Sequence, residues 1–415
     1  MATQTYDAIV IGGGIIGVSS AYHLARRGLR VAILERGPQV AAGSTGQSSA
    51  VVRQRYANAE VVQLAYSSLQ MFHDWCEHLE LKENHSGFSP VGVVWIPAAA
   101  NEHITDVMRH FQKVGVVGGM YAVNDLRERY PSLNFCRHAL DMTGASHGCA
   151  DPTTVFWEPE GGFADPQGTT EDLMRAGAAK GVDLHLRHQV VQIKTAGGVG
   201  LDGGFSCVEC TNGETFSCRL LLNACGAWCH GINELVGVTL PMDLRPTRVQ
   251  IALRDRPAEV SGEIPVFVSA SDQIYGRPEA NATQFIVGST DPEDESEAVN
   301  DPEQFDTKAS QEFRQRMMHK LHHRFSMSSR GSVRGYAALY TVNTDDWHPI
   351  IDAIGPDGYF VANGFSGHGF KLGPSIGALI ACRMTGVTLP DDPPVDVCYF
   401  AADRELIASS GGVLA

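Results

Sequence analysis

Residues 7–17 read DAIVIGGGIIG, a short apolar run that leads directly into a glycine-rich turn. Residues 18–27 follow with apolar side chains at helical spacing, and Gly28 ends this stretch. Residues 31–35 (VAILE) form a second apolar run that ends in an acid. A strand, a helix and a second strand within about 30 residues are typical of a dinucleotide-binding unit. The order of these elements predicts an α/β fold.

The glycines of this turn have separate tasks in such a unit. Gly12 allows the tight turn, Gly14 lets the backbone approach a pyrophosphate, and Gly17 lets helix and strand pack closely. The unpaired N–H groups at the helix N-terminus then face the phosphates. Glu35 is placed to accept hydrogen bonds from ribose hydroxyls and would repel a 2′-phosphate, which argues against NADP. The motif alone leaves FAD and NAD open.

A second glycine-rich segment lies near the other end of the chain. Residues 364–374 read GFSGHGFKLGP, and four glycines there allow the backbone to lie against a flat group. We expect Pro374 in the first turn of a helix over residues 375–385. That helix end and Lys371 would stabilise negative charge on a flavin that accepts two electrons. The two ends of the chain are therefore predicted to form one domain around a second, inserted domain.

Length and composition limit the classes of protein. A chain of 415 residues predicts two or three domains, and 43% hydrophobic with 19% charged residues fits a globular protein. A formal net charge of −15 disfavours nucleic acid and anionic membranes as partners. The N-terminus lacks the pattern of a secretory signal, and no apolar run is long enough to cross a bilayer. We therefore expect a cytoplasmic protein, either a monomer or a homo-oligomer, without membrane contact.

The cysteines and histidines give little sign of a metal site. The ten cysteines are scattered, and the pairs Cys207/Cys210 and Cys225/Cys229 are expected to be reduced, half-buried thiols. His319, His322 and His323 lie in a polar helical stretch and are expected on a solvated helix face. Residues 291–307 are acidic and rich in turn formers, which predicts a surface excursion. No metal ligands are predicted.

The sequence resembles the FAD-dependent amine oxidoreductases of the D-amino-acid oxidase superfamily, and most of all their sarcosine oxidase and dimethylglycine dehydrogenase branch. The resemblance covers nearly the whole chain. Its motifs are GGGIIG with Glu35, GSTGQSS (43–49), NACGAW (223–228), YGRP (275–278), and Tyr340-Thr341 together with GFSGHGFKLGP.

This resemblance implies a glutathione-reductase-like FAD-binding Rossmann domain and a substrate domain built on a mostly antiparallel sheet. The FAD-binding domain is expected to comprise residues 1–86, 150–225 and 330–415. The substrate domain would comprise residues 87–149 and 226–329.

The resemblance also assigns site residues. Arg53 and Lys371 match the cations that hold a substrate carboxylate, Tyr275 matches a substrate-site tyrosine, and the neighbouring Arg277 could add a third positive group. These three residues, Lys371, Arg53 and Tyr275, are the predicted catalytic positions. Lys371 is also among the predicted cofactor contacts, which are Gly12, Gly14, Ile15, Ile16, Gly17, Glu35, Arg36, Gly43, Ser44, Ser48, Ser49, Val191, Ala224, Gly226, Trp228, Gly364, Gly367, His368, Gly369, Phe370 and Lys371.

Several positions depart from the family pattern. Monomeric members carry a cysteine bonded to the flavin where this chain has Ala338, so FAD is predicted to be bound non-covalently. Ala50 replaces the first active-site arginine. Ile286 and Thr290 stand at the positions of the oxygen-activating lysine and a substrate-side histidine. Molecular oxygen and another electron acceptor therefore both remain open.

The implied reaction oxidises a C–N bond of a small secondary or tertiary amine that carries a carboxylate. Hydride passes to flavin N5, and the imine product is then hydrolysed. One alternative keeps the flavin but takes a D-amino, imino or 2-hydroxy acid. Another is the FAD subunit of a multi-chain complex of the sarcosine oxidase kind, and a third is a nucleotide-binding protein without catalysis.

Overall fold

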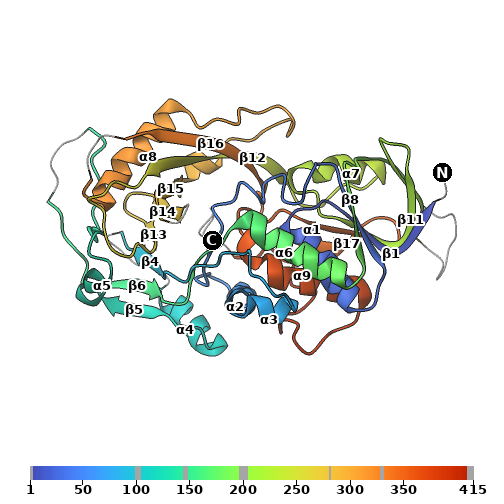
Figure 1. The fold of residues 1–415 in the computed structure, drawn as a ribbon, viewed down its shortest axis with the longest axis horizontal. Coiled ribbons are helices and arrows are strands. Elements are labelled where there is room, and N and C mark those ends of the chain that lie inside the picture. Colours follow the sequence, from blue (N-terminus) through green and yellow to red (C-terminus); the bar gives the residue numbers. More distant parts are fainter. Residues whose placement is uncertain are drawn as a thin grey trace.

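The computed structural model describes residues 3–98, 104–143, 148–195, 204–279, 282–327 and 331–408. Within these residues the chain forms two eight-stranded sheets and a small two-stranded sheet of β3 (Val51–Val52) and β7 (Gly162–Phe163). Figure 1 shows an elongated molecule in which the two large sheets occupy opposite ends.

The first sheet joins strands from the beginning, the middle and the end of the chain. Its main path runs β17-β18-β11-β1-β2-β8, and all neighbours pair in parallel except the edge strand β17. A hairpin of β9 and β10 extends it beside β11. The bounds are β1 (Gln4–Ile11), β2 (Val31–Glu35), β8 (Val182–Leu186), β9 (Val190–Thr195), β10 (Phe205–Cys210), β11 (Thr215–Asn223), β17 (Ile350–Ala353) and β18 (Tyr359–Asn363).

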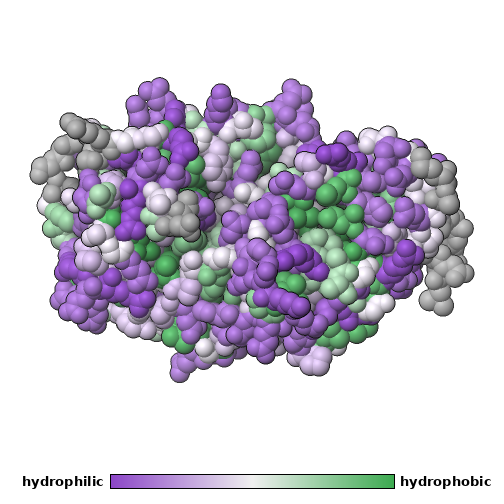
Figure 2. Space-filling view, viewed as in Figure 1, coloured by the Kyte–Doolittle hydropathy of each residue, from purple (hydrophilic) through white to green (hydrophobic). Residues whose placement is uncertain are grey.

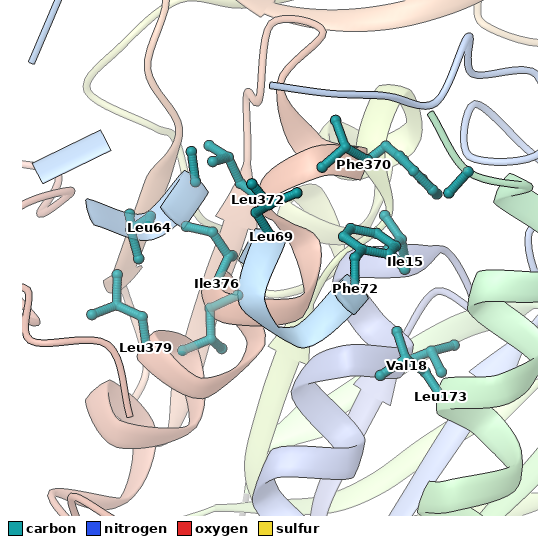
Figure 3. Close-up of a cluster of buried hydrophobic side chains, with 14 of the residues drawn as sticks. Ile15, Val18, Leu64, Leu69, Phe72, Leu173, Phe370, Leu372, Ile376 and Leu379 are labelled. Atoms are coloured by element: carbon teal, nitrogen blue, oxygen red, sulfur yellow. The ribbon is translucent and has the colours of Figure 1, made fainter. Parts of the chain in front are cut away.

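Two helices from opposite ends of the chain pack together beside this sheet. They are α1 (Ile15–Arg26) and α9 (Gly369–Thr385). Glycines allow the close approach, because a Cβ at Gly373 would lie 2.6 Å from Ile15 and one at Gly377 would meet Ser19. Figure 3 shows the apolar cluster that α1 and α9 form with α2 (Ala59–His73) and α6 (Pro166–Ala179). The short helix α3 (Trp75–Leu79) follows α2.

The start of α9 differs from the prediction. The helix begins at Gly369, six residues before position 375, and Pro374 lies inside it. Proline removes an N–H group from the helix interior. The backbone oxygen of Pro374 accepts a hydrogen bond from Ser19 Oγ at 3.3 Å and lies 3.1 Å from His23 Nε2. These contacts tie this part of α9 to α1, which the local sequence could not indicate.

The second sheet is antiparallel apart from one parallel pair, β4 and β13. Its order is β16-β12-β15-β14-β13-β4-β6-β5. The bounds are β4 (Val93–Ile96), β5 (Gly119–Ala122), β6 (Thr154–Glu158), β12 (Leu244–Asp255), β13 (Val266–Ser269), β14 (Ile274–Glu279), β15 (Gln284–Ser289) and β16 (Val333–Asn343). Strands β6 and β16 belong to this sheet although their residues fall within the expected FAD-binding ranges. The domain boundaries themselves stay a prediction.

The remaining elements lie around the two sheets. They are α4 (Ile104–Val114), α5 (Val123–Arg129), η1 (Gly226–Trp228), α7 (Cys229–Leu235), η2 (Pro292–Glu295) and α8 (Gln311–Arg324). Helix α8 carries the three histidines that were expected on a solvated face. That expectation is wrong for His323, because its side chain is only 6% exposed and faces Asp272.

The surface is mostly hydrophilic on the face that Figure 2 shows, in keeping with 47 acidic and 32 basic residues. An apolar area lies to the right of the centre, over the half of the molecule that contains the first sheet. Among the described residues, no helix has the length and apolar character needed to cross a bilayer.

Candidate functional site

A cavity of about 750 Å³ opens where four parallel strands end. Ile11, Glu35, Ala224 and Asn363, at or just after the carboxyl ends of β1, β2, β11 and β18, all line it. Ligands of open parallel sheets bind at this edge. Most predicted cofactor contacts line the cavity, namely Gly12, Gly14, Ile15, Ile16, Glu35, Arg36, Gly43, Ser44, Ser48, Val191, Ala224, Gly226, Trp228, Gly364, Gly367, Gly369 and Phe370.

The first glycine-rich turn forms one wall. Gly12 has φ +111°, and a Cβ there would lie 2.6 Å from the carbonyl oxygen of Ala224. Gly17 does not line the cavity, since it packs against the backbone oxygen of Gly12 and so supports the turn. Glu35 accepts hydrogen bonds from the N–H groups of Gly13 and Gly37, both at 2.6 Å. The carboxylate is therefore fixed at the cavity wall, where the sequence places a ribose partner.

A tryptophan and an arginine stack at another wall. The guanidinium of Arg36 lies 4.2 Å from the centre of the Trp228 ring, and Arg36 forms an ion pair with Glu303. The Nε1 atom of Trp228 is buried and has no hydrogen-bond partner among the described residues. A buried donor without a partner costs free energy, so this atom favours a polar ligand.

Residues 302–307 were expected in a surface excursion, and all six are exposed or half-buried, but part of the segment also covers the cavity. Pro302, Glu303, Phe305 and Thr307 line the cavity. The pairing of Glu303 with Arg36 helps to hold the segment there, as does Glu297 with Arg248 at 2.7 Å. Acidic, turn-rich composition indicates a loop but not the surface that the loop covers. The prediction also omitted other lining residues, among them His188, Gln189, Leu339, Tyr340 and Thr341.

The N-terminus of α9 lies at the cavity. Gly364 and Gly367 have φ +82° and +85°, and they turn the chain from β18 into the helix. Gly369 and Phe370, in the first turn of α9, line the cavity with backbone N–H groups that no earlier helical turn can accept. Asn363 Oδ1 accepts from the N–H of Gly226 at 2.7 Å, which ties this loop to the NACGAW segment. The arrangement presents a partial positive charge to a bound group.

The three predicted catalytic residues are not among those that line the cavity. Lys371 is 6% exposed, and its Nζ donates to the backbone oxygen of Gly367 at 3.1 Å. Burial and the nearby Arg53 hold the pKa of Lys371 well below its usual value of 10.5. The lysine is thus placed behind the loop that forms the cavity wall.

Arg53, Arg55 and Lys371 form what we call the cation cluster. The Arg53 guanidinium lies 4.2 Å from the centre of the Tyr56 ring, and that of Arg55 lies 4.4 Å from the Trp95 ring. Burial lowers the pKa of Arg55 to about 10.

The buried carboxylate of Glu158 lies near the cation cluster. Glu158 accepts from Trp95 Nε1 at 2.7 Å and from the N–H of Arg55 at 3.1 Å, and burial raises its pKa. The positive charges of Arg53 and Arg55 act on this carboxylate in the opposite direction and lower its pKa, but the effect of burial is larger.

Tyr275 lies on β14, where its hydroxyl group hydrogen-bonds with Ser49 and Tyr340. Its ring covers Gly288 of β15, which leaves no room for a Cβ there. Ser49 therefore faces Tyr275 and does not line the cavity. Tyr340 does line the cavity, so Tyr275 reaches it through one hydrogen bond.

Arg277 and His368 do not line the cavity, and their roles toward substrate and cofactor stay predictions. Arg277 forms an ion pair with Glu279 and donates to the carbonyl oxygens of Ser49 and Pro278. His368 is 4% exposed and packs edge-on against Tyr56, with ring centres 5.4 Å apart. Burial, followed by Lys371, holds the pKa of His368 well below 6.5.

These residues fit FAD. Glycines at the turn leave space for a pyrophosphate, Glu35 lies where a ribose would bind, and Trp228 Nε1 is a buried donor in need of an acceptor. A dinucleotide site at the carboxyl edge of a parallel sheet, with an antiparallel sheet beside it, defines the class of dinucleotide-dependent oxidoreductases.

The sequence pattern of the DAO family, described as FAD dependent oxidoreductase, matches residues 7–383. The chain belongs to this family and is an FAD-dependent oxidoreductase of the amino-acid oxidase and sarcosine oxidase type.

The similarity to known proteins extends over almost the whole chain. FAD-dependent oxidoreductase domain-containing protein 1 of Xenopus laevis is 25% identical and aligns with 90% of this chain and 78% of its own length. Monomeric sarcosine oxidase of Streptomyces avermitilis is 24% identical, with 93% and 95% covered. Among solved structures, L-proline dehydrogenase from P. horikoshii has a TM-score of 0.80 at 20% identity and covers 97% of this chain and 98% of its own. The mixed α/β fold is thus the one found in FAD-dependent amino-acid oxidases.

Proposed function

We propose that this enzyme oxidises a C–N bond of a small secondary or tertiary amine that carries a carboxylate, such as an N-methyl amino acid. The observation that carries the proposal is the convergence of two buried basic side chains, Arg53 and Lys371, next to the loop at the start of α9. An anionic ligand beside them would stabilise their charged forms away from water.

Arg53 and Lys371 would hold the substrate carboxylate. A guanidinium can donate two parallel hydrogen bonds to a carboxylate and so fix its orientation. Lys371 would exchange its bond to Gly367 for the substrate, and a negative charge beside it would restore its charged form. Tyr275 and Tyr340, hydrogen-bonded to each other, would shape the opposite side of the pocket.

FAD, when bound, supplies the acceptor for the two electrons that leave the substrate. The residues proposed to hold it are those that line the cavity from both glycine-rich segments. The N-terminal turn of α9 would stabilise negative charge at the part of the cavity that Gly369 and Phe370 line. The protein thus contributes orientation, a site shielded from water and a favourable field, with no residue required as an acid or base in the transfer itself.

The electron acceptor and the location are part of the proposal. Ile286 and Thr290 stand where sarcosine oxidases carry an oxygen-activating lysine and a histidine. We therefore keep two electron acceptors in the proposal, molecular oxygen and a second electron carrier. Monomeric sarcosine oxidase is similar to this chain over nearly the full length of both proteins. Its name supports an N-methyl amino acid as substrate. Cytoplasmic location and oligomeric state stay predictions.

Anaerobic bleaching of the bound flavin tests the substrate class. The purified holoenzyme is mixed with N-methyl amino acids, with N-methyl amines that lack the carboxylate, and with 2-hydroxy acids. We expect rapid bleaching by the first group and rates at least tenfold lower with the second. Bleaching by 2-hydroxy acids alone would overturn the proposal. Mixing the reduced enzyme with oxygen, or with a redox dye, then identifies the class of acceptor.

A further inference from the structure

Two cysteines and a histidine come together at a place that does not belong to the lining of the cavity. They are Cys136 and Cys149, in the segment between α5 and β6, and His323, in the last turn of α8. The Sγ atoms and a ring nitrogen all lie within 4.8 Å of one another. None of the three is among the residues that line the cavity.

His323 is held in a fixed orientation. Both carboxylate oxygens of Asp272 lie 3.0–3.1 Å from its Nδ1, and Nε2 on the other side of the ring is buried. Asp272 also accepts from Arg324 Nε at 2.6 Å, so the charge of that arginine is balanced within the cluster. A carboxylate that binds one imidazole nitrogen and so directs the other is the usual support of a metal-binding histidine.

Asn134 and Cys136 are fixed to α8. Arg324 donates to the backbone oxygen of Cys136 at 2.7 Å, and Asn134 Nδ2 donates to that of His323 at 2.8 Å. Cys136 is fully buried, whereas Cys149 is exposed. One ligand is therefore anchored in the protein, and another lies at the surface, which gives an ion a path to enter.

We propose that Cys136, Cys149 and His323 bind a zinc ion. Two thiolates and an imidazole are typical zinc ligands, and two thiolate charges balance the charge of Zn²⁺. A fourth, solvent-facing position beside Cys149 would complete a tetrahedral site. Bound zinc would cross-link Cys136 and Cys149 to α8 and so stabilise this edge of the second sheet.

A second group of possible ligands requires a test that tells the two apart. His185, His188 and Glu214 also lie within ligand distance of one another, and all three are half-buried. That group contains no sulfur. Co²⁺ bound by thiolates gives an intense charge-transfer absorption in the near ultraviolet, whereas Co²⁺ bound by imidazole and carboxylate alone does not, so the sulfur ligands can be detected directly.

The experiment is a titration of reduced, metal-free holoenzyme with Co²⁺, followed by displacement with Zn²⁺. We expect one equivalent of Co²⁺ with the thiolate band, loss of the band on adding zinc, and a higher melting temperature with zinc. The variant Cys149→Ser should weaken binding at least tenfold and reduce the band. Cys398→Ser changes another exposed cysteine outside the cluster and should behave like the wild type.

Two results would overturn the proposal. One is the absence of a thiolate band in the wild type, or a band of equal strength in Cys149→Ser. The other is a thiol count two short of the ten cysteines in denatured protein purified without reductant, together with a Cys136–Cys149 disulfide in a peptide map, since paired sulfurs cannot bind the ion. Because Cys149 is exposed, its serine variant is not expected to disturb folding.

Discussion

Lys371 Nζ donates a hydrogen bond to the backbone oxygen of Gly367, 3.1 Å away and one helical turn earlier. The lysine, in the first turn of α9, thus lies behind the loop that forms the cavity wall, with its amino group buried and held by the protein itself. Its charged form is disfavoured by burial and by Arg53. A ligand carboxylate would reverse this balance, and the first prediction follows from that reversal.

Carboxylate binding should depend on pH through Lys371. The pKa of Lys371 in the ligand-free site lies well below 10.5, and a bound carboxylate raises it. Binding therefore takes up a proton at pH values between the pKa of the ligand-free site and the higher pKa of the complex, so in this range the Kd of a small unreactive carboxylate should rise with pH, by up to tenfold per unit. Flavin absorbance changes measure the Kd. In Lys371→Met the rise should be absent, and a persistent rise would assign it to another group.

Substitution of Arg53 should affect only substrates that carry a carboxylate. Hydrogen bonds to a charged group contribute about 1.5–3 kcal/mol, so Arg53→Met should lower kcat/KM roughly 10- to 100-fold for such amines. An amine without the carboxylate should be oxidised at its already low rate. Arg109→Met, at a side chain 67% exposed on α4, is the control. Equal losses with both kinds of amine would contradict a role in carboxylate binding.

The glycine at position 12 should be essential for cofactor binding. Gly12→Ala would place a Cβ 2.6 Å from the carbonyl oxygen of Ala224 at a residue with φ +111°. We expect the protein to lose at least nine-tenths of its FAD, measured by the ratio of visible to ultraviolet absorbance. Gly231 also lines the cavity, but a Cβ there would meet nothing within 4 Å. Gly231→Ala should keep its FAD. A colourless Gly231→Ala would show that FAD binding is lost with any added methyl group at the cavity, and would contradict a specific role of Gly12.

Room for the Tyr275 ring should be required for turnover but not for FAD binding. In Gly288→Ala the new methyl group would overlap that ring and displace it. Since the tyrosine hydrogen-bonds with Tyr340 at the cavity, we expect kcat/KM to fall about tenfold or more with FAD retained. Gly148→Ala, where a Cβ would meet nothing within 4 Å, is the matched control. Unchanged kinetics in Gly288→Ala would show that Tyr275 is not part of the substrate site.

Acid should release the flavin. Ala338 lies buried in β16 two residues before Tyr340 and offers no thiol for a covalent bond. After acid precipitation, the yellow colour should remain in the supernatant, which a spectrum of the two fractions measures. Colour that stays with the precipitate would mean that the cofactor is bonded to another residue. Cys225, in the cavity lining, would then be a candidate.

Local sequence predicted much of the first sheet and of the cavity because both glycine-rich segments are continuous in the chain. Gly12, Glu35 and Gly369 could be assigned from spacing and from the strand or helix beside them. Glu303 could not, since its place depends on an ion pair with Arg36 some 260 residues away in sequence. The start of α9 was misplaced for a similar reason, because packing against α1 outweighs the local effect of Pro374.

The pairing of α1 with α9 bears on how the protein acquires its cofactor during synthesis. Gly12 emerges from the ribosome long before Gly369 and Phe370, which lie more than 350 residues further along the chain. While the residues between them are made, a nascent chain carries only half of the binding site. Capture of FAD therefore has to wait for the second glycine-rich segment, and a shortage of the vitamin from which FAD is made would act on chains that have already passed this point.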